Sequence, residues 1–184
     1  MRFRLLLPVA AVLIATAAGG CSSSARSASG TPATLPASAV PYLPSVHKPL
    51  RAGLLQREDE APGLAGKLDA WGFQAGAERY FQGESHRLQV VDSRTLRFHD
   101  ASGAAAYVGF MRSHLAPYLG TFPKVRSIRG GIVATGQECQ CHLANPALLA
   151  MIARGRIVTW LEINGPGATQ RRLIELIYQA QQHD

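Results

Sequence analysis

Cysteine is scarce in this sequence, and its scarcity limits what can hold the fold together. The chain has 184 residues and three cysteines, which excludes the dense disulfide framework of small secreted domains. Cys139 and Cys141 lie close together, and Cys21 stands far from them near the N-terminus. The fold is therefore expected to rest on a hydrophobic core, for which the chain is long enough.

A long apolar run is missing as well. Residues 5–18 are mostly apolar but fall short of the roughly 20 residues that cross hydrocarbon, so a membrane-spanning helix is not expected there. The run follows Arg2 and Arg4 and precedes the small residues 18–20. A basic start, a short apolar run and small residues in this order predict a secretory signal peptide over residues 1–20.

Recognised catalytic motifs are also missing from the sequence. It contains no G-x-S-x-G, no H-E-x-x-H, no G-x-x-x-x-G-K-[ST] and no EF-hand loop. The six histidines are spread along the chain, and the acidic residues show no pairing typical of a glycosidase. We therefore predict no catalytic residue and no cofactor, and a non-enzymatic role is favoured.

Positive charge exceeds negative charge, but it is not concentrated in one segment. Nineteen Lys and Arg residues stand against twelve Asp and Glu residues, for a formal net charge of +7. Scattered arginines indicate a solvated basic surface, which favours anionic lipid or envelope polymers as neighbours. Nucleic acid is not an expected partner, because the signal peptide predicts a location outside the cytoplasm.

The position of Cys21, directly after small residues, resembles the lipobox of bacterial lipoproteins, although Ala18 stands where an aliphatic residue is usual. In that family the signal peptide is cleaved before the cysteine, and fatty acyl chains such as palmitate are attached to it. The resemblance implies that Cys21 is lipidated and anchors the protein at the extracytoplasmic face of the cell membrane. Each buried CH2 group of such a chain contributes about 0.8 kcal/mol to anchoring.

The composition predicts three segments. After the signal peptide, residues 21–51 comprise the lipidated cysteine and a Ser-, Ala- and Pro-rich stretch, for which we predict a disordered linker. Residues 52–184 are predicted to form a single domain. This arrangement of signal peptide, linker and single domain resembles that of small envelope lipoproteins of the actinobacterial type. Membership of that group implies no particular activity.

Within the domain, hydrophobic periodicity predicts alternating strands and helices. Helices are expected from Asp100 or Ser102 to Pro117 and from Thr169 to Gln182, and a short third helix from Ala147 to Arg154. Strands are expected at residues 88–91, 95–98, 125–128, 132–135 and 156–163, with a further strand or hairpin over residues 71–81. This pattern predicts an α+β fold: a mainly antiparallel sheet with two long helices packed on one face.

The sharpest local motif is Glu138-Cys139-Gln140-Cys141-His142. In an oxidising compartment the two thiols can form a structural disulfide, which is the favoured interpretation. Alternatively, Cys139, Cys141 and His142 bind a soft metal, with His86, His99 or His114 completing the site. A thiol-redox couple is a third interpretation, although the spacing differs from the C-x-x-C motif.

Four aromatic residues, Trp71, Phe73, Tyr80 and Phe81, are candidates for a ligand-binding groove, and core packing is their alternative role. Taken together, the sequence favours a membrane-tethered, extracytoplasmic lipoprotein that acts as a binding or assembly module. Its partner would be an envelope protein or an apolar or anionic ligand. The alternative is a metal-binding or thiol-redox protein that uses Cys139, Cys141 and His142.

Overall fold

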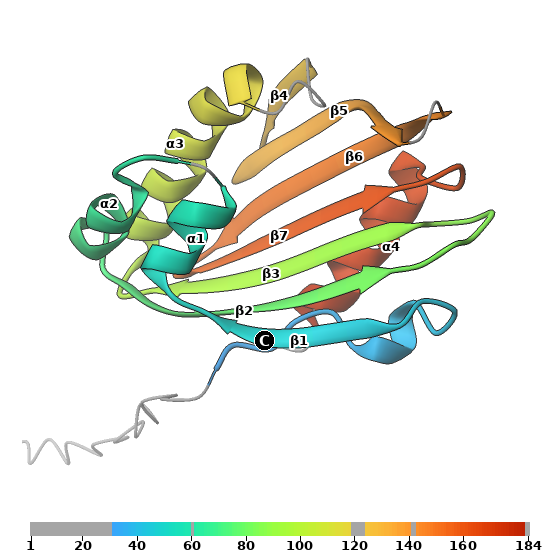
Figure 1. Ribbon diagram of the computed structural model, residues 1–184. Helices are drawn as coiled ribbons and strands as arrows, with labels where there is room; N and C mark the ends of the chain where they lie inside the picture. The colour runs from blue at the N-terminus through green and yellow to red at the C-terminus, as the bar shows by residue number, and fades with distance from the viewer. Residues whose placement is uncertain (1–30, 60, 119–123, 141–142, 183–184) are drawn as a thin grey trace, which may run out of the picture.

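The computed structural model of the protein describes residues 31–59, 61–118, 124–140 and 143–182. Its centre is a seven-stranded sheet with the strand order β1-β2-β3-β7-β6-β5-β4, in which every neighbouring pair is antiparallel (Figure 1). The strands are β1 (Ser45–Leu50), β2 (Phe73–Gln82), β3 (Val90–Phe98), β4 (Lys124–Ile128), β5 (Gly131–Gln140), β6 (Leu143–Arg154) and β7 (Ile157–Asn164). The helices are α1 (Ala52–Glu58), α2 (Leu64–Ala70), α3 (Ala101–Tyr118) and α4 (Gln170–Gln181).

The sheet consists of two meanders that meet at one seam. Strands β1, β2 and β3 follow one another in the chain and in the sheet, and so do β4, β5, β6 and β7. Helix α3 connects the two meanders, and pairing of β3 with β7 joins them into one sheet. The first and last strands in this order, β1 and β4, form its edges.

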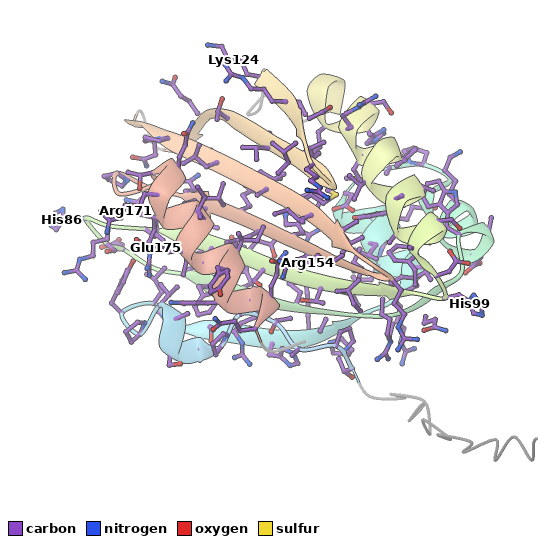
Figure 2. The ribbon with its side chains drawn as sticks, turned by 180° about the vertical axis from the view of Figure 1, so that it is seen from behind. His86, His99, Lys124, Arg154, Arg171 and Glu175 are labelled. Carbon is purple, nitrogen blue, oxygen red and sulfur yellow. The ribbon has the colours of Figure 1, made fainter. Side chains whose placement is uncertain are left out.

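The two longest helices lie on opposite faces of the sheet, so the predicted fold class, with both on one face, is wrong. Helix α3, together with α1 and α2, packs on one face, and α4 packs on the other with residues 31–44 (Figures 1 and 2). We call these the α3 face and the α4 face. Side chains of the central strands alternate between them: Leu149 and Met151 of β6 lie in the core of the α3 face, and Leu148 and Ala150 in that of the α4 face. The fold is therefore a sheet-dominated α+β fold with a core on each side.

Strand β6 replaces the short helix that was predicted over Ala147–Arg154. Its sequence, rich in Ala, Leu and Met, has a high intrinsic preference for helix. However, β6 lies between β5 and β7 and is buried on both faces, so it shows no apolar–polar alternation. Pairing with two neighbours overrides the local preference, and Asn145 and Pro146 belong to the strand instead of starting a helix.

The predicted starts of both longer helices are confirmed. The Oδ1 atom of Asp100 accepts a hydrogen bond of 2.9 Å from the backbone N–H of Gly103 at the start of α3. At the start of α4, the Oγ1 atom of Thr169 accepts one of 3.2 Å from the N–H of Arg172. These contacts satisfy backbone donors that have no partner inside the helix.

The described fold begins before residue 52, where the domain was expected to start. Strand β1 pairs with β2 along its whole length, and Leu35, Val40 and Leu43 are buried in the core of the α4 face. Residues 31–51 are therefore part of the folded unit. The predicted signal peptide and Cys21 lie outside the described residues. Within the described part of the chain, no helix is both long and apolar enough to cross a membrane.

Candidate functional site

A buried arginine organises a cluster of charged side chains on the α3 face. Arg94 of β3 is 9% exposed, and each of its guanidinium nitrogens meets a different carboxylate. Nη1 lies 2.6 Å from Oδ1 of Asp59, Nε lies 3.0 Å from Oε1 of Glu78, and Nη2 lies 2.8 Å from Oδ2 of Asp92. The Nζ atom of Lys48 lies 2.6 Å from Oε2 of Glu78. We call these five residues the Arg94 cluster.

The register of four neighbouring strands places these residues in rows across the sheet. One row runs Lys48, Glu78, Arg94 and Trp160, from β1 through β2 and β3 to β7. The next row runs Val46, Tyr80, Asp92 and Glu162 along the same four strands. Because residues two apart on a strand share a face, both rows lie on the α3 face.

One further contact, with an aromatic ring, holds Arg94 in place. Its guanidinium group lies over the indole ring of Trp160, 5.0 Å from the ring centroid, in a cation–π geometry. Asp59 follows the last residue of α1, so its ion pair with Arg94 joins this helix to the sheet. The cluster therefore connects three consecutive strands, the seam with β7 and the end of α1.

A pocket of about 360 Å³ opens beside the cluster. It is lined by Val46, Lys48, Glu78, Tyr80, Asp92 and Arg94. These residues come from β1, β2 and β3 only, so the pocket lies at the β1 side of the sheet. We call it the Arg94 pocket. Its wall combines one aromatic and one aliphatic side chain with four charged groups, so it is more polar than most small-molecule sites.

The protonation states of the two pocket carboxylates differ. Burial, together with the nearby charges of Glu78 and Glu162, raises the pKa of Asp92 to about 8 against the opposing effect of Arg94. Burial also opposes ionisation of Glu78, but its hydrogen bond with Lys48 and the charges of Arg94 and Lys48 outweigh burial, so the pKa of Glu78 is lowered. At neutral pH the protonated form of Asp92 is therefore favoured, whereas Glu78 beside it is ionised.

The four aromatic residues singled out in the sequence do not line a common groove. Trp71 and Phe73 pack in the core of the α3 face, where Trp71 lies 5.7 Å from the ring of Phe110. Phe81 is fully buried in the core of the α4 face. Tyr80 is half-buried and is the one aromatic of the four that lines the Arg94 pocket.

The cysteine motif falls largely outside the described residues. The backbone of Cys139 belongs to β5 and pairs with Ala144 of β6, whereas Cys141 and His142 lie in the segment that the structure does not describe. The disulfide and the metal site therefore stay predictions. Figure 2 shows His86 and His99 at opposite ends of the sheet, so these two cannot complete the same site. Within the described ranges, no three His, Cys, Asp or Glu side chains are grouped as metal ligands.

A second pocket, of about 410 Å³, lies at the start of α4 and is a weaker candidate. Its arginines already have partners in the protein. Arg171 and Arg172 both contact Glu175, at 2.9 Å and 3.3 Å, and Arg87 lies over the ring of Tyr42. Figure 2 labels Arg171 and Glu175 on α4. The groups in this pocket thus compensate one another at the surface, where ion pairs contribute little.

None of the Arg94 cluster was predicted as a site residue. The available signal was the spacing of Asp92 and Arg94, two residues apart on one strand, in the sequence Val-Val-Asp-Ser-Arg-Thr-Leu-Arg-Phe. Two opposite charges on one face of a buried strand require further charged partners. Which residues serve as these partners depends on strand register, and the sequence does not specify it.

Comparison with known proteins gives a fold but no family. No protein-family model matches the sequence, and no curated protein matches it. Among solved structures, the chain is similar to the extracellular domain of PknH from Mycobacterium tuberculosis, with a TM-score of 0.51 and 10% sequence identity. The match covers 74% of this chain and 79% of that domain. At this identity the likeness shows a shared fold alone.

Proposed function

We propose that this protein is a membrane-tethered, extracytoplasmic binding module and that the Arg94 pocket is its ligand site. The observation that carries the proposal is a buried ion cluster that forms the wall of a pocket. The signal peptide and the lipobox-like Cys21 support the location, as does a fold like that of an extracellular domain.

Stability alone is a poor reason to retain such a cluster. Removing charges from water costs several kcal/mol per ion, and well-packed apolar residues in the same place are often as stable or more stable. Strongly shifted pKa values beside a pocket are instead typical of functional sites. We therefore assign the Arg94 cluster to ligand binding.

A pair of matched substitutions tests the site. Val46 is 67% exposed at the rim of the Arg94 pocket, and Ile174 is 65% exposed on α4, on the opposite face. In a thermal-shift screen of amines, sugars, amino acids and organic acids, we expect at least one compound to raise the Tm of the full-length protein. Val46→Trp should obstruct the pocket and weaken binding of that compound by about tenfold or more, which corresponds to about 1.4 kcal/mol. Ile174→Trp should leave the affinity unchanged. A screen without any stabilising compound, or equal effects of both substitutions, would contradict the assignment.

The tether is tested separately by Cys21→Ser. In a bacterial host that processes lipoproteins, the wild-type protein is expected in the membrane fraction, labelled by an alkyne analogue of palmitate. The substituted protein should lose the label completely and appear in the soluble fraction, because lipid chains supply the membrane affinity. Cys139→Ser, which removes a different thiol, should retain the label. Membrane association of Cys21→Ser without label would reject lipid anchoring.

A further inference from the structure

The Arg94 pocket has more acidic than basic side chains around it, although the whole chain is basic. Two basic residues stand against four acidic ones: Lys48 and Arg94 against Asp59, Glu78, Asp92 and Glu162. All three guanidinium nitrogens of Arg94 already meet carboxylates, and Lys48 meets Glu78. An anionic ligand would have to separate these ion pairs. A cationic ligand would add to them, so the charge of the pocket favours a cation.

Asp92 provides a specific point of attachment. It is 6% exposed and lines the pocket, and its Oδ2 atom contacts Arg94. No described N–H or O–H group donates a hydrogen bond to its other oxygen, Oδ1, which is fully buried. When Asp92 is ionised, this oxygen is a buried acceptor without a donor, which is costly, so a ligand whose N–H group replaces the proton would be stabilised here. Asp92 also lies within hydrogen-bonding reach of Glu78, which places two carboxyl groups side by side at the pocket wall.

The remaining wall suits an organic cation rather than a bare metal ion. Tyr80 stands between Val46 and Asp92 in the row across the sheet, so an aromatic and an aliphatic side chain flank the carboxyl group. An aromatic ring attracts an ammonium group through its π-electrons, and apolar side chains cover a hydrocarbon stem. Within the described residues, no set of side chains is arranged as metal ligands.

On the basis of the proposed function, we infer that the Arg94 pocket binds a small organic ammonium ion with a short aliphatic stem. Asp92 and Glu78 hold the charged head, and Tyr80 and Val46 contact the stem. Binding exchanges one cation for another: the O–H bond of the Asp92 carboxyl group breaks, its proton leaves to solvent, and the ammonium takes its place between the two carboxylates. No covalent bond to the ligand forms.

Three four-carbon probes of equal length separate charge from shape. Butane-1,4-diamine, butane-1,4-diol and succinate are titrated into the full-length protein in a non-ionic detergent, and binding is measured by isothermal titration calorimetry. The diamine is expected to bind at least about tenfold more tightly than the diol, since hydrogen bonds between charged groups are about twice as strong as neutral ones. Succinate is expected not to bind.

Proton release gives a second readout that a merely structural cluster would not produce. The charged groups that face Asp92 are Arg94 on its own strand, Glu78 on β2 and Glu162 on β7, with Lys48 on β1 and Asp59 after α1 one contact further away. From the helix packed on this face, the titratable group that interacts with Asp92 is the buried Tyr107 of α3. Below the pKa of Asp92, the diamine must displace a proton, so its affinity should rise as the pH increases from 6 to 8. The rise should approach about tenfold per pH unit at the lower end and level off above a pKa of about 8, because the amines keep their own protons there. Titrations in two buffers of different ionisation enthalpy count the released protons.

Substitutions locate the effect. Asp92→Asn is expected to abolish proton release on binding and to lower the affinity for the diamine by about tenfold. A Tm measurement shows whether the variant is folded. Asp69→Asn, which removes an exposed carboxylate from α2, should change neither the proton release nor the affinity for the diamine. Tyr80→Leu should weaken binding several-fold while proton release persists.

The possible failures point to different conclusions. If the diol or succinate binds as tightly as the diamine and Val46→Trp blocks it, the ligand class is overturned while the proposed binding function stands. If calcium chloride binds and the diamine does not, the ligand class is likewise overturned while the proposed binding function stands. Diamine binding that Asp92→Asn and Val46→Trp leave intact overturns the site. If no probe and no compound of the wider screen binds, the proposed function fails as well.

Discussion

Replacing Arg94 by Met is expected to lower the free energy of unfolding at pH 7 by about 3–5 kcal/mol. Met fills a similar volume, so the loss would come from charge rather than from a cavity. Three buried carboxyl groups lose their common partner, Arg94, while Glu78 keeps its ion pair with Lys48. Urea denaturation followed by far-UV circular dichroism measures the change. Arg154→Met, which removes an exposed arginine, should change stability by less than about 0.5 kcal/mol.

A double-mutant cycle separates this cause from a general loss of packing. In the wild-type protein, Asp59→Asn removes one partner of Arg94 and should destabilise the fold by about 1–2 kcal/mol. In the Arg94→Met background the same substitution removes a buried charge that has lost its arginine, so it should stabilise the protein. If Asp59→Asn destabilises both backgrounds equally, the two residues are not energetically coupled and the cluster does not act as a unit.

The second large effect is expected at Gly103, in the first turn of α3. A Cβ atom at this position would overlap the backbone carbonyl oxygen of Trp71, where α2 ends. Because the opposing atom belongs to the backbone, it cannot rotate away as a flexible side chain would. Gly103→Ala should therefore destabilise the protein by about 2–3 kcal/mol, in the upper part of the range for overpacked positions.

Gly109 on the same helix supplies the matched control. A Cβ atom there would have no neighbour within 4 Å. Ala is the better helix former, so Gly109→Ala should stabilise the protein by about 0.5–1 kcal/mol. Thermal unfolding of both variants checks the pair: opposite signs are expected. A stable Gly103→Ala variant would mean that α2 and α3 do not approach as closely as described.

Local signals in the sequence predicted where the two longer helices start, but not the face of the sheet on which each helix packs. Asp100 and Thr169 were recognisable as caps because their side chains act on backbone groups three residues away, which is information contained in the sequence. The location of α4 was not recoverable in this way. Its buried stripe shows that it packs on a sheet, but both faces of the central strands are apolar, so either face would accept it.

Strand β6 shows a different limit. Its residues prefer helix, and the evidence for a strand lies in β5 and β7, which pair with it on either side. The candidate site could not be predicted from the sequence for the same reason. Lys48, Glu78 and Arg94 are distant in the chain, and they meet because the strands align in one register. Local preference and periodicity carry no information about register when both faces are buried.

The seam between the two meanders has a consequence for folding kinetics. The pairs β2–β3, β4–β5, β5–β6 and β6–β7 close short loops, so these hairpins are expected to form in microseconds, whereas α1 and α2 lie between β1 and β2. Pairing of β3 with β7 closes a loop that contains α3 and most of the second meander. This long-range closure raises the contact order and should limit the folding rate. Arg94 stacks on Trp160 across the seam, so the residue that organises the pocket also lies where the slow step is completed.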